Sequence, residues 1–240
     1  MNMNRQEIIL KITDLTVHYG PITALKKINL EITRGEIVAL FGSNGAGKST
    51  LLNSVMGIKK PTEGSIVFRE REIQSWNPEK INRFGIQLIP EKGGIFKTLT
   101  VEENLQLGAY HSFHYYQRNY ESVVQLFPLL KKRLKQIAGT LSGGEQRILS
   151  FSKVLMFPTQ FLMIDEPSLG LSPKYIQVIF ESIQALNQKG YTILLAEQNV
   201  RQSLKYARKF YVLESGQIVL HGNKEDVRNY SEIKEAYLGS

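Results

Sequence analysis

The feature that most constrains the fold of this chain is a phosphate-binding pattern near its N-terminus. Residues 42–49 read Gly-Ser-Asn-Gly-Ala-Gly-Lys-Ser and match the pattern G-x-x-x-x-G-K-S at every position. An apolar run at 37–41 precedes the pattern and a helical pattern at 48–56 follows it, which is the strand, loop and helix order that the motif requires. Glycines let the backbone curl so that N–H groups point at phosphate oxygens, and the helix adds its positive N-terminal end. This order predicts an α/β domain that binds ATP.

The residue types within the loop indicate separate roles. Lys48 supplies a positive charge for the β- and γ-phosphates, and the hydroxyl of Ser49 suits Mg²⁺, a hard cation that prefers oxygen ligands. The other residues of this stretch expected to contact the nucleotide are Gly42, Ser43, Asn44, Gly45, Ala46, Gly47 and Thr50.

Two carboxylates follow a second apolar strand. Residues 161–164 are Phe-Leu-Met-Ile, and Asp165 and Glu166 come directly after them. Ligands of open α/β sheets bind where the strands end, so these side chains are expected near the phosphates. Asp165 suits Mg²⁺, through water, and Glu166 is placed to polarise an attacking water. The chain is therefore expected to hydrolyse ATP.

Composition excludes several other classes. The chain has 240 residues, 42% of them hydrophobic and 22% charged, which is typical of a globular domain. It has no cysteine, which excludes disulfides, thiolate metal sites and Cys nucleophiles. No apolar run approaches the roughly 20 residues of a membrane-spanning helix, and the polar N-terminus does not resemble a secretory signal. The formal net charge of +8 is spread along the chain and is read as a solvated surface.

Short apolar runs alternate with helical patterns, which predicts an α/β sheet interrupted by a mostly helical insert. The insert is expected at about 93–156, and the core at 1–92 and 157–240. Ser172 and Pro173 are expected to begin a helix that reaches Gln188. The predicted strands are 8–12, 25–32, 37–41, 65–68, 85–89, 161–164, 192–196, 210–213 and 217–220, the last two joined by a turn at Ser215-Gly216.

A third stretch, 141–146, reads Leu-Ser-Gly-Gly-Glu-Gln and forms a second small-residue loop before a helix. It is another anion-binding helix N-terminus. One nucleotide does not need two such cradles from one chain, so the second is expected to serve a nucleotide held by another subunit. With this motif the sequence resembles, over nearly its whole length, the ATP-binding subunits of ABC transporters.

The resemblance implies an ABC ATPase domain, with a RecA-like P-loop core, an N-terminal antiparallel β subdomain and a helical insert. It implies two ATP-binding subunits meeting head to tail, as a homo- or heterodimer, with two ATP molecules between them. Tyr19 matches the aromatic residue that stacks on adenine, and residues 168–171 match the loop that crosses the dimer interface. The residues that would face the γ-phosphate of the partner's ATP are Ser142, Gly143, Gly144 and Gln146.

Two positions depart from the common family pattern. Glu91 stands where many members have a glutamine that links Mg²⁺ to the membrane subunit, and is expected near the metal. Gln198 stands where many members have a histidine that touches the γ-phosphate; it can donate a hydrogen bond but cannot carry a positive charge. Either activity is weak or depends on a partner, or these residues are settled features of one branch. The second interpretation is preferred, because segments at 90–91, 100–105, 165–171, 197–199 and 237–239 resemble importers of branched-chain and related amino acids, whose shorter ATP-binding subunit this chain resembles.

The resemblance also implies partners and a place in the cell. ATP would join the two subunits and hydrolysis would release them, and this motion would pass to membrane permease subunits and indirectly serve a solute-binding protein. The chain is expected in the cytoplasm, on the inner face of the cell membrane. The insert and the loop near Glu91 are expected to contact the permease. The aromatic residues between Phe113 and Tyr120 are expected mainly to pack the insert's own core, with permease contact as the alternative.

Other functions remain open at this point. Within transport they are urea uptake and lipid export. Outside transport they are a soluble ABC ATPase or a non-hydrolysing regulatory subunit. The short distance between the two loops argues against an ATPase of DNA repair or chromosome organisation, and the single ATP-binding domain argues against the ribosome-associated type. The intact Asp165 and Glu166 argue against the regulatory subunit. No nucleic acid is expected as a partner, and the four histidines lack metal-ligand spacing.

Overall fold

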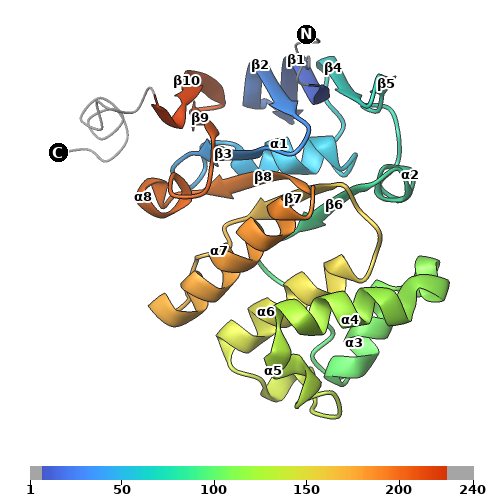
Figure 1. Ribbon diagram of the computed structural model, residues 1–240. Helices are drawn as coiled ribbons and strands as arrows, with labels where there is room; N and C mark the ends of the chain where they lie inside the picture. The colour runs from blue at the N-terminus through green and yellow to red at the C-terminus, as the bar shows by residue number, and fades with distance from the viewer. Residues whose placement is uncertain (1–6, 226–240) are drawn as a thin grey trace, which may run out of the picture.

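Two β-sheets form the body of the protein, shown as a computed structural model that describes residues 7–225 (Figure 1). The first sheet is antiparallel, in the order β2-β1-β4-β5. The second has the order β10-β9-β3-β8-β7-β6, with five parallel strands and β10 antiparallel at one edge. The strands are β1 (Ile8–Tyr19), β2 (Ile22–Thr33), β3 (Ile37–Phe41), β4 (Glu63–Phe68), β5 (Arg71–Glu72), β6 (Ile86–Ile89), β7 (Phe161–Asp165), β8 (Thr192–Glu197), β9 (Lys209–Glu214) and β10 (Gln217–Asn223).

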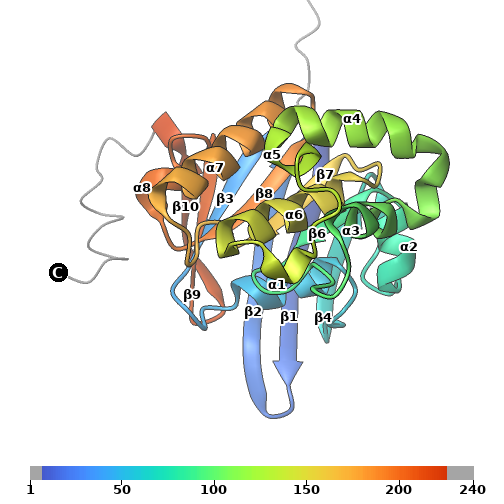
Figure 2. The same ribbon diagram turned by 90° about the horizontal axis from the view of Figure 1, so that it is seen from below.

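Helices cover the parallel sheet, and four of them gather in a lobe beside it. Helices α3, α4, α5 and α6 lie together in this helical lobe, while α7 lies against the sheet (Figure 1). Seen from below, the β1–β2 hairpin projects from the side of the body (Figure 2). The helices are α1 (Lys48–Val55), α2 (Pro78–Arg83), α3 (Val101–Gly108), α4 (Tyr116–Leu126), α5 (Pro128–Lys131), α6 (Gly143–Leu155), α7 (Pro173–Gln188) and α8 (Val200–Ser203), with 3-10 turns η1 (Tyr110–Tyr115) and η2 (Ala138–Thr140).

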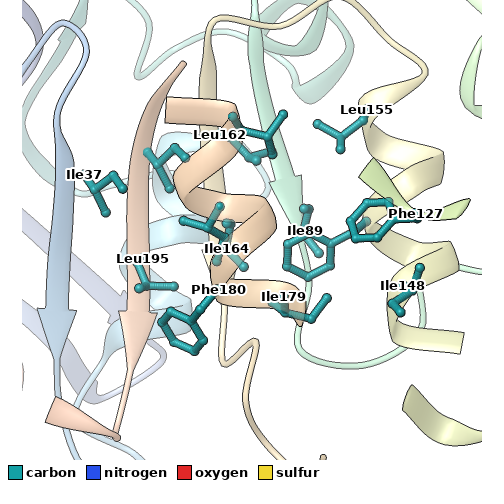
Figure 3. Close-up of a cluster of buried hydrophobic side chains, with 14 of the residues drawn as sticks. Ile37, Ile89, Phe127, Ile148, Leu155, Leu162, Ile164, Ile179, Phe180 and Leu195 are labelled. Atoms are coloured by element: carbon teal, nitrogen blue, oxygen red, sulfur yellow. The ribbon is translucent and has the colours of Figure 1, made fainter. Parts of the chain in front are cut away.

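The central strands β3, β7 and β8 are buried at every position because each separates two cores. In β3, Ile37, Ala39 and Phe41 face the core shared with the helical lobe, whereas Val38 and Leu40 face the core between the two sheets. Successive side chains of a strand point to opposite faces, so a strand buried on both sides reads as a continuous apolar run. The first core extends without interruption into the lobe, where Phe127 and Ile148 pack with residues from the sheet (Figure 3).

The fold class predicted from the sequence is confirmed. Every predicted strand is present, and the helix over Pro173–Gln188 has the predicted bounds. The expected insert contains only helices and loops in the structure, whereas its exact limits, 93–156, stay a prediction. Segment 237–239 lies outside the described residues.

Three details differ from the prediction. Strand β1 does not end at Ile12 but continues to Tyr19, because a bulge at Asp14 (φ 47°) breaks the alternation that marks a strand. The short elements β5, α2 and α8 were not predicted. Ser172 occupies the N-cap of α7 as predicted, but its side chain makes no capping hydrogen bond.

The connection from β6 into the lobe is held by one buried amide. Asn104 is 0% exposed, and its side chain accepts from the N–H of Phe96 (2.7 Å) and donates to the carbonyls of Phe96 and Thr100 (both 2.9 Å). Thr100 also caps α3 in a reciprocal capping box with Glu103. The amide therefore fixes the loop that carries Glu91 onto the first helix of the lobe.

We predict that Asn104→Ala lowers the free energy of unfolding by about 1–3 kcal/mol, because it leaves partly buried backbone groups of Phe96 and Thr100 without their partners. Urea unfolding followed by circular dichroism measures this. Gln106→Ala, at an exposed position of the same helix, is the matched control and should change stability by less than about 0.5 kcal/mol. Equal midpoints for the two variants would contradict the role assigned to Asn104.

Candidate functional site

The phosphate loop curls between the end of β3 and the start of α1. Gly45 (φ 82°) and Gly47 (φ 113°) both have the left-handed backbone that glycine adopts readily. A side chain at Gly47 would also stand 2.8 Å from Leu25 and 3.0 Å from the carbonyl of Ala24, so the loop approaches the hairpin too closely for any other residue. The glycine pattern read from the sequence is therefore required by the observed geometry.

Lys48 is buried at the centre of the loop. It is 5% exposed, and its ammonium donates to the carbonyls of Gly42 and Ser43 (3.2 Å to the latter). Its Nζ also lies 2.9 Å from Oε1 of Glu166 and forms an ion pair in which both side chains are buried. The ion pair brings together the two motifs that the sequence assigned to phosphate binding and hydrolysis.

The two carboxylates at the end of β7 differ in their surroundings. Burial raises the pKa of Asp165, the charges of Glu166 and Glu91 add to the rise, and a hydrogen bond with the Ser49 side chain opposes it. Oδ1 of Asp165 is buried and accepts no hydrogen bond from the described residues. Glu166 has a left-handed backbone (φ 46°), and its N–H donates to the carbonyl of Ala196 (2.9 Å). Such strain in a non-glycine residue is typical of functional sites.

The oxygen donors here fit a magnesium ion. The Ser49 hydroxyl and the unpartnered Oδ1 of Asp165 are hard ligands, the charges of Glu166 and Glu91 act on Asp165, and Glu166 is ion-paired with Lys48. Within 7–225 there is no group of three or more acidic or histidine side chains that could cage a metal alone. Mg²⁺ commonly takes only one or two protein ligands and completes its shell with water and phosphate.

A shallow hollow of about 160 Å³ lies over the loop. Glu91 reaches it from the loop after β6, as predicted, and its side chain is 29% exposed and ion-paired with Lys92 (3.3 Å). Tyr19 does not line the hollow; it stands half-exposed at the end of β1, with the ammonium of Lys59 4.4 Å from its ring centre. The residues that line the hollow are Ala24, Ser43, Asn44, Gly45, Gly47, Lys48, Ser49, Thr50, Glu91 and Glu166.

Gln198 reaches the phosphate loop from the end of β8. Its side-chain N–H donates to Oδ1 of Asn44, which brings a third strand end to the site. Glu197 beside it is 1% exposed and accepts from the backbone N–H groups of Ser168 (2.8 Å), Gln198 (3.1 Å) and Asn199 (3.3 Å). The buried carboxylate therefore fixes the position of Gln198 and of the loop at 168–171.

The second small-residue loop begins α6 and lies outside the hollow. Ser142 caps the helix in a reciprocal capping box with Glu145. Ser142 and Gly143 are exposed, whereas Gly144 is buried so close to Tyr175 that an added Cβ would stand 2.3 Å from its ring. The side chain of Gln146 turns back and donates to the carbonyl of Leu141 (2.9 Å). The exposed first turn thus offers backbone N–H groups that the helix itself does not use.

Sequence reasoning missed Arg147, which joins the parts of the site. Its guanidinium, 9% exposed, donates to the carbonyls of Pro90, Glu91 (3.0 Å) and Asp165 (2.7 Å). Arg147 lies one helical turn after Gly143, on the buried side of α6. The available signal in the sequence was therefore a charged residue at a core position of this helix. Sequence reasoning also missed Glu197. The available signal was its position as a carboxylate at the end of a buried strand.

Comparison with known proteins gives consistent results. The family described as ABC transporter matches residues 25–169. The chain is 43% identical to the high-affinity branched-chain amino acid transport ATP-binding protein BraG of Pseudomonas aeruginosa, over 96% of this chain and 100% of BraG. It is 34% identical to the probable branched-chain amino acid transport ATP-binding protein LivF of Archaeoglobus fulgidus, over 96% and 99%. Among solved structures, the ADP conformation of MJ1267, an ATP-binding cassette of an ABC transporter, matches with a TM-score of 0.84 at 27% identity, over 97% and 99% of the two chains.

We predict a pH-dependent stability from Glu197. Burial raises its pKa despite the three N–H donors, so the folded state holds the proton to a higher pH than the unfolded chain, whose glutamates titrate near about 4.3. The folded state therefore binds more protons in that window, and the stability of the parent relative to Glu197→Gln should fall as pH rises from about 4.5 to 8. Urea unfolding at a series of pH values measures this difference.

The amide in Glu197→Gln has one acceptor oxygen in place of two, which adds an offset that does not vary with pH. Glu214→Gln, at an exposed position of β9, controls for the loss of one carboxylate. If the stability of the parent relative to Glu197→Gln instead increased with pH, hydrogen bonding rather than burial would determine the pKa of Glu197.

Proposed function

This chain belongs to the ABC transporter family of ATPases, and we propose that it is the ATP-hydrolysing subunit of a membrane importer for branched-chain or related amino acids. The observation that carries the proposal is the presence of two separate phosphate cradles. The hollow over Lys48 contains no residue of the loop at 141–146, whose Ser142 and Gly143 remain exposed. The second cradle is then available to an ATP held by another subunit, either a second copy or a related chain.

The roles of the site residues are part of this proposal. Residues 42–50 bind the nucleotide, with Lys48 exchanging its carbonyl partners for phosphate oxygens, and Tyr19 offers a half-exposed ring to adenine. Ser49, Asp165 and, less directly, Glu91 hold Mg²⁺, which when bound neutralises phosphate charge. The backbone of the Ser142 loop, with Gly143, Gly144 and Gln146, receives the partner's γ-phosphate.

Glu166 and Gln198 act on the water and the γ-phosphate. Glu166 is released from Lys48 when phosphate takes the ammonium, and its carboxylate is then free to orient and polarise a water. Gln198 already donates toward the loop through Asn44, and the same N–H can donate to a phosphate oxygen. A neutral amide gives less electrostatic stabilisation than an imidazolium, so we expect slow turnover by the isolated chain.

The helical lobe offers a contact surface for a permease. Several large apolar side chains on the lobe and beside it are exposed. Tyr116 and Tyr120 are not exposed in this way, because they pack against the core. A pocket of about 210 Å³ lies in the same region, between the lobe and the end of α2. We assign this surface to a membrane subunit, because an exposed apolar patch marks an interaction site. Its exposed members are Phe96, Leu107, Tyr110 and Phe113.

Family membership and the names of the relatives support the proposed place in the cell and the proposed cargo. Within 7–225 no helix is long and apolar enough to span a membrane. Attachment to the inner face of the cell membrane would therefore come through permease subunits. The names of BraG and LivF support a branched-chain amino acid cargo, whereas urea uptake and lipid export are the alternatives within the family.

We predict that Glu166→Gln abolishes steady-state ATP turnover and retains ATP binding, because the amide keeps the shape of the carboxylate but cannot accept the proton of water. Phosphate release and equilibrium binding of ATP measure the two properties. Glu181→Gln, at an exposed position of α7, is the control and should turn over ATP at the parent rate. Turnover by Glu166→Gln at that same rate would show that another group activates the water.

The cargo is tested by the partner. Isolation of the tagged chain from its native membranes should recover amino-acid permease subunits, and membrane vesicles that contain the complex should take up leucine only when ATP is supplied on the side of this chain. Recovery of a urea or lipid permease, with no leucine uptake, would reject the amino-acid cargo and leave the ATPase assignment intact.

A further inference from the structure

A second cleft lies at the opposite end of the parallel strands from the phosphate loop. It has a volume of about 580 Å³, within the range of small-molecule sites and larger than the hollow over the loop. Its walls come from the start of β6, from residues 158–160 before β7 and from the segment before β8, and its other wall is α4. The cleft therefore lies at the strand beginnings and separates the helical lobe from the core.

The charged side chains in the wall of this cleft all have the same sign. Arg69, Arg83 and Lys189 come from the core side and Arg118 from α4, and no Asp, Glu or His is among the lining residues. Arg83 has an ion pair with Glu79 on the exposed surface of α2 (2.8 Å), which contributes little. Among the described residues, the other three cations have no ion pair. Four cations facing one cleft repel each other and create a site that favours an anion.

Arg69 is held in the cleft by a strained turn. It is the first residue of the two-residue turn between β4 and β5, and both turn residues have left-handed backbones (Arg69 φ 48°, Glu70 φ 61°). Hairpin turns of this type strongly favour Asn-Gly, so an Arg-Glu turn holds backbone strain at both residues. The turn places the guanidinium over the rings of Phe68 and Phe84, 5.2 and 5.8 Å from their centres.

The hydrogen bonds of Arg69 are only partly satisfied. It donates to the carbonyl of Phe84 (3.3 Å) and to the side chain of Gln160, whereas its Nε is buried without an acceptor. Burial lowers the pKa of Arg69, and the nearby charge of Arg34 lowers it further, with Glu7 acting in the opposite direction. Glu7 is engaged in two 2.8 Å hydrogen bonds with Arg34 and does not line the cleft.

We propose that this cleft binds a small, multiply charged phosphate compound. Guanidinium groups match phosphate oxygens in geometry, and a ligand with several phosphate groups can contact Arg69, Arg118 and Lys189 together. Tyr115 and Tyr191 add ring surface to the same walls, which suits a nucleotide as well as an inorganic polyphosphate. Because Arg118 belongs to the helical lobe and the other cations belong to the core, such a ligand bridges the two parts and favours the arrangement in which they are close.

The test uses inorganic tripolyphosphate as the probe and isothermal titration calorimetry as the measurement. The full chain carries Lys48→Gln and Glu166→Gln, which disable the phosphate loop without leaving one member of its ion pair alone. One saturable site is expected in this background. Adding Arg118→Gln and Lys189→Gln should weaken it at least about tenfold, because the probe loses two charged contacts. Both positions are exposed, so the substitutions do not disturb the core.

The matched control replaces Lys131 and Lys132, exposed residues of α5 and its end, by glutamine, which removes the same charge outside the cleft. Its affinity should stay within about twofold of the background. The same comparison in the parent chain saturated with Mg-ADP tests the site with an intact phosphate loop. Tighter binding of ADP than of tripolyphosphate in the disabled background identifies a nucleotide as the ligand, and the reverse identifies a polyphosphate. Equal affinities in the cleft and control variants, or no saturable binding in either background, would overturn the proposal.

Discussion

The arrangement of the site depends on the register of three parallel strands. Phe41 of β3 pairs with Glu197 of β8, and Asp165 of β7 pairs with Ala196 of β8, so the three strands end at the same level of the sheet. The phosphate loop follows the end of β3, Glu166 follows the end of β7, and Gln198 follows the end of β8. Because the strands are buried on both faces, a shift of one residue would turn each apolar side chain toward the other core and move each side chain of the candidate site by about 3.3 Å.

The ion pair between Lys48 and Glu166 is a consequence of this register. Bringing strand ends together concentrates carboxylates around one ammonium, and the desolvation of such groups is expensive unless they are paired. The ion pair is therefore better suited to exchanging partners than to stabilising the fold. In the proposed function, a phosphate that enters the loop would take the ammonium, and the carboxylate that it leaves would act on water. Binding and activation would then be properties of a single contact.

Much of this could be read from the sequence because it is local. The phosphate loop, the buried strands and the two cradles each follow from residue type and spacing within about fifteen residues, as the glycine backbone at 45 and 47 illustrates. Arg147 and Glu197 could not be found in this way, because their partners are backbone groups of Pro90, Glu91 and Ser168, distant in the chain. The bulge at Asp14 hid half of β1 for a related reason, since its effect depends on pairing with β2. Tertiary hydrogen bonds leave no periodic signal in a sequence.

The helical lobe faces the core at both ends of the parallel strands. At the strand ends, Arg147 of α6 fixes the lobe to the carbonyls of Glu91 and Asp165, so the helix that follows the Ser142 loop is tied to the loop after β6 and to the end of β7. At the strand beginnings, the lobe and the core face each other across a cleft with like charges on both walls. Direct hydrogen bonds hold the first edge, whereas like charges face each other across the second. Under the two proposals made above, rotation of the lobe about the first edge would change the width of the cleft, and an anion bound there would act on the same motion that ATP drives from the other side.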